Sequence, residues 1–390
     1  MTLDAGQPQA ARPRVLLVQP LYAHYRFATL LALSKSEQVD FDFAAGADTF
    51  QGNVATFDAD QLPSASALKN IWIGPFLWQR RLVSTLLSRE YDAVVITGSD
   101  THLSAWIAAI VARLKGTRVL FWTTGWHRKD PVARGAVRVA FYRLAHQLLL
   151  YNERGSDLGE QSGYPMSRMT VIFNSQGSPP SGISGGRVGE SEDIPRKSNK
   201  PTVVAVARLI ATKKLDQVIR ASAILAESGQ EIRVILAGDG PERDRLRLLA
   251  EELNVELVLP GGIYDEGALR QLYSVATVTA VPGPVGLTAV QSMKYGVPVI
   301  SHSNPDHQVA EWEAIREGQT GGLFVEDDVN DLARVISAWT SASPRRLQNA
   351  QADCLEEYSA KWTPQGHADR IVQGIMITLA GSKKTDRRTS

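Results

Sequence analysis

The sequence predicts an α/β protein built from two Rossmann-like, parallel-sheet domains that face a cleft. Its 390 residues are too many for one ordinary domain and fit two. Short β-branched runs alternate with helical patterns in both halves, which is typical of parallel sheets covered by helices. Between the halves, residues 176–200 contain five Gly, five Ser and three Pro, the composition of a linker or loop.

The first domain, residues 1–175, has five predicted strands with helical patterns between them. The strands are residues 15–18, 93–97, 118–122, 147–151 and 170–173, and the helices are 27–36, 79–88, 103–114 and 134–144. The second domain, residues 201–365, continues with strands 202–206, 233–237, 257–259, 278–281 and 298–301. Its helices are predicted at 215–228, 242–253, 267–275 and 287–294. Residues 366–380 form a final helix, and residues 381–390 form a basic, flexible tail.

Composition excludes several classes of protein. The hydrophobic share of 44% and charged share of 21% argue against global disorder. The single cysteine, Cys354, excludes a disulfide framework and is typical of a reducing compartment. The start of the chain lacks the apolar run of a signal peptide, and no apolar stretch reaches the roughly 18–20 residues of a membrane span. We therefore expect a cytoplasmic protein that binds the inner face of the cell membrane at most peripherally.

The second half carries two features that can bind phosphate. Arg208 and Lys213 follow the strand 202–206, and side chains of these types at the edge of a cleft can clamp a diphosphate. Gly286, Leu287 and Thr288 begin a helix, whose free N–H groups and dipole attract phosphate.

A third feature, the segment Gly-Asp-Gly-Pro that begins at Gly238, directly follows the strand 233–237. Its glycines allow the backbone to turn tightly. Taken alone, the segment is an ordinary turn from a strand to a helix.

In this order and spacing, residues 207–324 resemble the donor domain of retaining glycosyltransferases of family 4, which have the GT-B fold. The resemblance covers the Arg–Lys element, the Gly-Asp-Gly-Pro turn, the Gly-Leu helix start, Gly-Val-Pro-Val-Ile at 296–300 and Gly-x-Thr-Gly at 318–321. It implies that Arg208 and Lys213 face the pyrophosphate of a nucleotide-sugar donor, a UDP-, GDP- or dTDP-sugar. It also implies metal-independent chemistry without a cofactor, and a final helix that crosses back to the first domain.

The chain departs from the family at two glutamates that lie eight positions apart. In the family, the first holds sugar hydroxyls and the second holds the ribose; here the positions are Gly283 and Gln291. An amide in place of a carboxylate weakens a hydrogen bond by about 1 kcal/mol, or about fivefold in affinity. Gln291 can therefore still bind the ribose. Gly283 has no side chain, and Pro284 removes a backbone donor.

The residue that replaces the missing side chain of Gly283 must come from elsewhere. Five polar residues follow the strand 298–301 and are candidates to contact the sugar or the acceptor; the alternative is that they are solvated loop residues. They are His302, Asp306, His307, Glu311 and Glu313. His302, Asp306 and His307 are of metal-ligand type but follow no regular motif, so no metal site is predicted.

The first half offers further candidates at its strand ends. His24 and Arg26 follow the first strand, in a segment that resembles the corresponding loop of polysaccharide-extending members of the family; they are expected at the acceptor or the donor phosphate, or as ordinary loop residues. Either Thr124 or His127 is expected to contact the transferred sugar, since many relatives have a histidine at the position of Thr124. Asn174 resembles a residue that orders the domain junction.

Charge is distributed unevenly, although the net charge is only +1. Between Lys69 and Arg143 there are 12 basic and four acidic residues together with five tryptophans. This stretch can contact an anionic membrane; the alternative is a solvated helix face with tryptophans in the core. No nucleic-acid partner is expected, because the chain is nearly neutral overall and carries no binding motif.

The sequence therefore predicts a retaining glycosyltransferase that transfers a sugar to a lipid-linked or oligosaccharide acceptor in envelope or exopolysaccharide synthesis. Arg208, Lys213 and the helix start would stabilise charge on the leaving diphosphate, and no enzyme nucleophile is required. Two alternatives remain open. Because Gly283 and Gln291 depart from the family, the chain could be an inactive GT-B protein that binds a nucleotide or glycan, or a nucleotide-sugar epimerase of the same fold.

Overall fold

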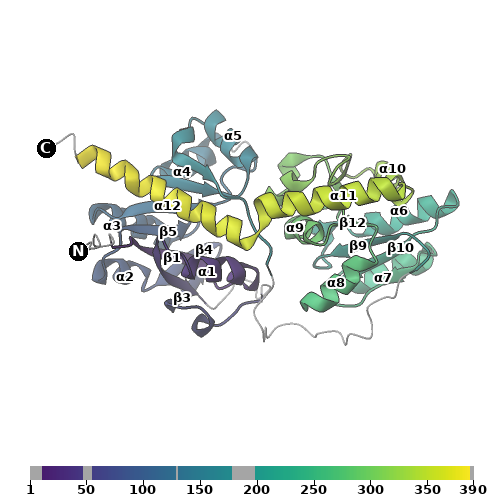
Figure 1. Cartoon of the computed structure of the whole chain (residues 1–390), viewed down its shortest axis with the longest axis horizontal. Helices are drawn as coiled ribbons and strands as arrows, with labels where there is room; N and C mark the ends of the chain where they lie inside the picture. The colour runs from purple at the N-terminus through teal and green to yellow at the C-terminus, as the bar shows by residue number, and fades with distance from the viewer. Residues whose placement is uncertain (1–10, 47–54, 129–130, 178–197, 387–390) are drawn as a thin grey trace, which may run out of the picture.

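The computed structural model describes residues 11–46, 55–128, 131–177 and 198–386, which form two α/β domains (Figure 1). Most of the predicted linker, residues 178–197, lies outside the described residues. Each domain has one sheet, and the sheets are parallel except for one edge strand. The predicted class, two parallel-sheet domains, is confirmed.

The sheet of the first domain has eight strands in the order β4-β3-β2-β1-β5-β6-β7-β8. They are β1 (Arg14–Leu21), β2 (Asp40–Gly46), β3 (Ala65–Ile73), β4 (Phe76–Arg80), β5 (Ala93–Thr97), β6 (Arg118–Thr123), β7 (Gln147–Leu150) and β8 (Met169–Val171). Strands β2, β3 and β4 were not predicted from the sequence. The helix predicted at 79–88 is wrong at its start, because Gln79 pairs with Asn70 in the β3–β4 hairpin.

Two layers of helices cover this sheet. On one face lie α1 (Phe27–Ser34) and α12 (Pro364–Asp386), and on the other α2 (Leu82–Ser88), α3 (Leu103–Leu114), α4 (Val132–Tyr142) and α5 (Glu153–Gln161). Trp122 and Trp126 are buried in these two cores. Two of the tryptophans of the basic stretch are therefore core residues, as the alternative interpretation expected.

The sheet of the second domain has six parallel strands in the order β11-β10-β9-β12-β13-β14. They are β9 (Thr202–Val206), β10 (Arg233–Ala237), β11 (Leu257–Val258), β12 (Val278–Ala280), β13 (Val299–His302) and β14 (Gly321–Phe324). The helices are α6 (Asp216–Glu227), α7 (Arg243–Glu252), α8 (Glu266–Ser274), α9 (Leu287–Lys294), α10 (Val329–Thr340) and α11 (Pro344–Glu357). The strands are short and mostly buried, and the domain has two hydrophobic clusters: a large one, and a smaller one that includes Val204, Ile235 and Leu272.

The last helix, α12, leaves the second domain and packs against α1, β6 and β7 of the first (Figure 1). Trp362, just before it, is fully buried, and its indole donates to Glu357. The helix continues to Asp386, six residues beyond its predicted end, so residues 381–386 are helical and not a flexible tail. Among the described residues, no helix is long and apolar enough to cross a membrane.

Gly374 of α12 allows this helix to lie close to the sheet. A Cβ atom there would be 2.6 Å from a methyl carbon of Leu149, whereas a Cβ at Gly381 on the same helix would meet nothing within 4 Å. We expect Gly374→Ala to lower the free energy of unfolding by about 1–3 kcal/mol through overpacking. Gly381→Ala should leave it unchanged or raise it by up to about 1 kcal/mol. Urea unfolding of both variants checks this, and equal effects would contradict it.

Candidate active site

The turns after β9 and β10 interlock through two glycines. A Cβ atom at Gly238 would lie 1.9 Å from the carbonyl oxygen of Ala207, and one at Gly240 would lie 2.2 Å from that of Leu209. The amide of Leu209 donates to the carbonyl of Asp239 at 2.9 Å. Glycine is therefore required because the two backbones touch, and the contact holds the exposed side chain of Arg208 at the carboxyl edge of the sheet.

Lys213 and Gly283 lie in backbone contact. The amide of Gly283 donates to the carbonyl of Lys213 at 3.0 Å, and the Lys213 ammonium donates to the carbonyl of Pro284 at 2.5 Å. A Cβ atom at Gly283 would be only 2.1 Å from the carbonyl oxygen of Thr212. This backbone therefore has no room for the glutamate that the family carries there.

The start of α9 lies beside the same lysine. Gly286 is the N-cap residue with φ 60°, and Lys213 Nζ is 3.9 Å from the position that its Cβ would take. The hydroxyl of Thr288 donates to the carbonyl of Val206 at 2.8 Å, which ties the helix start to β9. Leu287 is the first helical residue. A helix N-terminus and a lysine thus converge on one point, an arrangement that binds phosphate.

The charge of Glu311 acts on Lys213 at this point. Glu311 is 6% exposed, lies in the 3-10 turn Ala310–Ala314 and accepts a hydrogen bond from the Asn174 amide. Burial lowers the pKa of Lys213, the charge of Glu311 raises it, and the charge of Arg208 lowers it again. The structure therefore gathers two of the predicted cations and one of the predicted acids, and Glu311 partly balances the half-buried ammonium of Lys213.

Arg26 completes this network from the first domain. Its guanidinium donates to the Asn174 side-chain oxygen at 2.7 Å and to the Tyr151 hydroxyl at 2.5 Å, and it lies 4.8 Å from the ring centroid of Trp122. Arg26 is 7% exposed. One polar chain, from Arg26 through Asn174 and Glu311 to Lys213, thus crosses between the domains.

A second group of residues gathers around Gln291. His24 of the first domain lines a small pocket with Gln291 and Tyr264, together with Glu266 and Lys294. The His24 Nδ1 atom is 3.0 Å from the carbonyl oxygen of Ala55, so this nitrogen carries the proton in the neutral ring. Burial lowers the pKa of His24. His24 and Gln291, the residue at which the family resemblance predicts a ribose contact, therefore line the same pocket.

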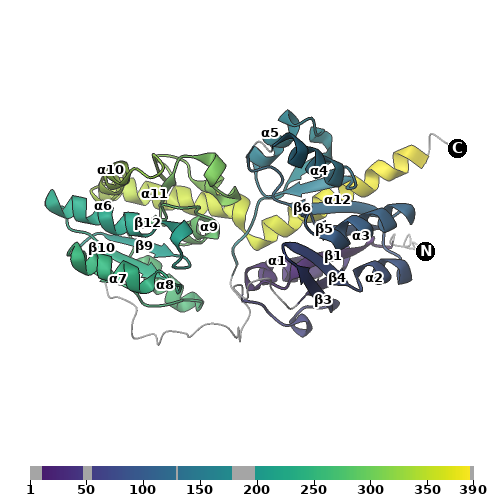
Figure 2. The same cartoon turned by 180° about the vertical axis from the view of Figure 1, so that it is seen from behind.

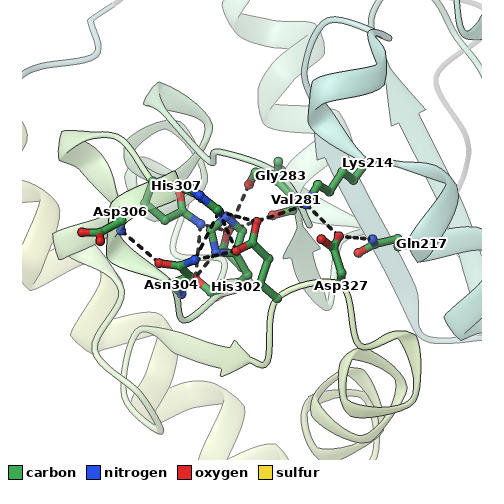
Figure 3. A network of polar contacts seen from close by, with 12 residues as sticks. Lys214, Gln217, Val281, Gly283, His302, Asn304, Asp306, His307 and Asp327 are labelled. Carbon is green, nitrogen blue, oxygen red and sulfur yellow. Dashed lines mark hydrogen bonds and ion pairs between the residues drawn. The ribbon is translucent and has the colours of Figure 1, made fainter. Parts of the chain in front are cut away.

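Three candidates lie elsewhere: His302 ends β13, and Asp306 and His307 lie in the turn after it. Asn304 and His307 bond to the carboxylate of Glu326, which also accepts from Lys214, within the polar network of Figure 3. Burial raises the pKa of Glu326, but these three hydrogen bonds lower it to about 2 overall.

His302 is fully buried, and its Nδ1 atom accepts from the amide of Asn304 at 3.2 Å. Asp306 pairs with Arg154 of the first domain. No group of three metal-ligating side chains converges within the part of the chain that the structure describes.

Glu313 connects the domains a second time. Its carboxylate accepts from the amides of Glu153 at 2.9 Å and Arg154 at 2.7 Å, so it caps α5 of the first domain. Thr124 and His127 follow β6, where the carbonyl oxygen of Thr124 lies 3.1 Å from the ideal Cβ position of Gly155, near the start of α5. A sugar contact by Thr124 or His127 remains a prediction.

Sequence reasoning missed Tyr151 and Tyr264. Each is an aromatic residue that follows a strand end, Tyr151 directly after β7 and Tyr264 after the glycine pair beyond β11. The position at a strand end was the available signal, but nothing in the chain's pattern indicates that these residues meet Arg26 and His24.

Comparisons with known proteins agree with this arrangement. Residues 189–353 match the family model described as "Glycosyl transferases group 1". EpsD of Bacillus subtilis (strain 168), which is named as a glycosyltransferase, is 26% identical over 274 residues, covering 66% of this chain and 69% of EpsD. A GDP-mannose-dependent phosphatidylinositol dimannoside mannosyltransferase of Mycobacterium tuberculosis is 36% identical over 101 residues, about a quarter of each chain.

Solved structures share the fold over nearly the whole length. HepE of Anabaena, in complex with UDP and glucose, superimposes with a TM-score of 0.65 at 16% identity, over 94% of this chain and 100% of HepE. A sucrose-phosphate synthase of Thermosynechococcus elongatus gives 0.66 at 17% identity, over 95% and 100%.

The chain has the GT-B fold of these solved glycosyltransferases, and its residues 189–353 match the group 1 glycosyl transferases. Its donor domain is that of the group 1 glycosyl transferases, which is consistent with the family 4 resemblance of its motifs. The recognition made from the sequence is confirmed.

The contact at Gly283 can be tested by adding one methyl group. Gly283→Ala should displace the turn that holds Lys213, because its Cβ would overlap the carbonyl of Thr212. We expect the affinity for UDP or GDP, measured by calorimetry, to fall at least tenfold, a cost of about 1.4 kcal/mol. Gly381→Ala is the matched control and should bind as the wild type does. Unchanged binding by Gly283→Ala would show that the close contact between Gly283 and Thr212 is not needed to position Lys213.

Proposed function

We propose that this protein transfers a sugar from a nucleotide-sugar, with retention of configuration, to a lipid-linked or oligosaccharide glycan of an exported polysaccharide. The observation that carries the proposal is the convergence of Lys213, the α9 start and buried Glu311 at the domain junction. The UDP and glucose bound by HepE support a nucleotide-sugar donor. The name of a Streptomyces coelicolor relative, an exopolysaccharide phosphotransferase, supports the polysaccharide context.

In the proposed mechanism, the donor diphosphate occupies the space between Arg208, Lys213 and Gly286. Positive groups that already point at the leaving group stabilise the charge that develops on it, without reorganisation during the reaction. No metal is required for this step, because the two cations and the helix start supply the charge. The acceptor attacks on the face from which the diphosphate departs, so the enzyme needs no nucleophile.

Glu311 takes over the role of the absent glutamate. It comes from a neighbouring loop, and its charge is close enough to Lys213 to raise the pKa of that lysine. The backbone around Gly283 excludes a longer side chain, so a carboxylate that acts on the sugar has to enter from a different element. Gln291 and His24 hold the ribose and base from opposite sides of the cleft.

The inactive-protein alternative rests on Gly283 and Gln291, and one screen separates it from the enzyme. Purified protein is incubated with UDP-, GDP- and dTDP-sugars, with and without a lipid acceptor, and nucleotide release is followed. Acceptor-dependent release supports the transferase. Binding without release supports an inactive binding protein. Conversion of the donor sugar without acceptor indicates an epimerase, and absence of binding contradicts all three.

The role of Glu311 is tested by Glu311→Gln, which keeps a hydrogen-bond acceptor for Asn174 and removes the charge. Loss of a preorganised charge at a reacting centre costs about a hundredfold in rate. We therefore expect kcat to fall by about that factor while the affinity for the nucleotide changes little. Glu313→Gln, two residues along the same turn, should keep kcat within about threefold. Equal losses in both variants would mean that Glu311 only joins the domains.

The lowered pKa of Lys213 predicts an alkaline limit to donor binding. The ammonium binds diphosphate only below its pKa, so affinity should fall as pH rises through a value lower than that of an ordinary lysine. In Glu311→Gln this limit should move to still lower pH, because the charge of Glu311 raises the pKa. Lys213→Arg should abolish the limit, since arginine stays protonated. A limit that is unchanged in Lys213→Arg would assign it to another group.

A further inference from the structure

The β3–β4 hairpin of the first domain has an unusual distribution of polarity. Directly opposed residues of an antiparallel pair lie on the same face, and the register pairs Ile71 with Trp78 and Ile73 with Phe76. This outer face is exposed: Ile71 is 40%, Ile73 64% and Phe76 42% accessible to solvent. The tip of the hairpin is therefore apolar on the side that faces solvent.

The opposite face of the hairpin buries amides. Asn70 and Gln79 are 6% and 4% exposed. Gln79 donates to the carbonyl of Gln19 at 2.9 Å and to Asn70 at 3.2 Å, and Asn70 donates to the carbonyl of Pro20 at 2.7 Å. Leu77 is also buried on this inner face, so the tip of the hairpin is apolar on both faces. An ordinary surface hairpin is polar on the face toward solvent, and the exposed apolar outer face therefore indicates a partner of its own.

The base of the same face is positively charged. Lys69 stands directly opposite Arg80, and like charges in this position destabilise a strand pair. Arg81 follows, and residues 65–81 contain no acidic residue. In the described part of the chain, no acidic side chain forms an ion pair with these three cations. An anionic partner relieves the repulsion between them.

The hairpin also stands at the edge of the sheet that carries the site. The pairing of β2 with β3 ends at Gly46 and Leu68, and among the described residues, 69–73 pair with β4 alone. β4 is the outermost strand of this sheet, and the hairpin lies below β1 in the view of Figure 2. Through Asn70 and Gln79 the hairpin is bonded to the end of β1, directly before the loop that carries His24.

We propose that the outer face of the β3–β4 hairpin docks on an anionic membrane surface. Ile71, Ile73, Phe76 and Trp78 enter the interfacial region, while Lys69, Arg80 and Arg81 contact the lipid headgroups. The hairpin has an apolar, aromatic tip and cations at its base. This matches an anionic leaflet, which is negative at its headgroups and apolar below them. The rigid amide contacts hold the β1 loop near the membrane, where a lipid-linked acceptor emerges. This last step rests on the proposed function; the docking itself does not.

Vesicle sedimentation with the full chain tests the docking. Wild-type protein should bind vesicles of phosphatidylcholine mixed with phosphatidylglycerol, more weakly at high salt, and should not bind phosphatidylcholine alone. Ile73→Ser with Phe76→Ser should weaken binding at least tenfold. Lys69→Gln with Arg80→Gln should weaken it about 25-fold, since each cation near an anionic leaflet contributes about fivefold.

Matched controls keep the test specific. Leu114→Ser removes an exposed leucine from α3, which covers the other face of the sheet, and Arg345→Gln removes an exposed cation from the second domain. Both should bind as the wild type does. The proposal is overturned if wild-type protein ignores anionic vesicles, or if Leu114→Ser loses as much binding as the hairpin variants. It is also overturned if sedimentation velocity shows a dimer that only the hairpin variants lose, which would make a second copy the partner.

Failure of the docking and failure of the proposed function give different results. Hairpin variants should keep wild-type nucleotide release with a water-soluble acceptor and lose it with an acceptor embedded in vesicles. If no acceptor supports release but the vesicle binding follows the pattern above, the transfer reaction is wrong and the docking stands. If release is normal with both acceptors in every hairpin variant, the hairpin does not deliver the acceptor.

Discussion

The structure depends on one buried charge, the carboxylate of Glu311. A buried carboxylate is costly unless nearby cations and hydrogen-bond donors compensate it. Here the compensation comes from both domains: Asn174 donates to it, Arg26 orients Asn174, and Lys213 lies close enough to be affected by its charge. Each partner therefore helps to keep the others in place. The junction of the two domains and the turn that carries Lys213 are for this reason linked through Glu311.

A second constraint is the close approach of backbones at the strand ends. Gly238 and Gly283 each lie where a Cβ atom would overlap a carbonyl oxygen of the neighbouring turn. Two turns in such contact cannot shift independently. The backbone positions of Arg208 and Lys213, which lie next to these contacts, are therefore fixed without a bound ligand. The same close packing leaves no room for a side chain at Gly283, and in the proposed function Glu311, from a different loop, supplies the carboxylate.

Much of the donor domain could be predicted, because its elements are local and regular. The strand-then-turn pattern of 202–206 and 233–237, the Gly286 helix start and the Arg208–Lys213 pair are all visible along the chain. The predictions failed where pairing is non-local: β3 and β4 alternate weakly, and they are recognisable as strands only once Asn70 and Gln79 meet the carbonyls that end β1. His302, Asp306 and His307 are equally plausible sugar contacts in the sequence, but in the structure Asp306 pairs with Arg154 and His307 bonds to Glu326.

The sequence by itself determined the fold class, the glycosyltransferase family and the cations of the donor side, because hydrophobic period, glycine spacing and helix starts are short-range properties. Only the tertiary structure decided which acid lies near Lys213, that the side chain of Arg26 is buried, and that the β3–β4 hairpin exposes its isoleucines to solvent. Each of these depends on contacts between segments that are distant in the sequence. Residues 26, 174 and 311 are separated by more than a hundred positions at each step, and contacts at such separation arise from the packing of two domains and not from local pattern.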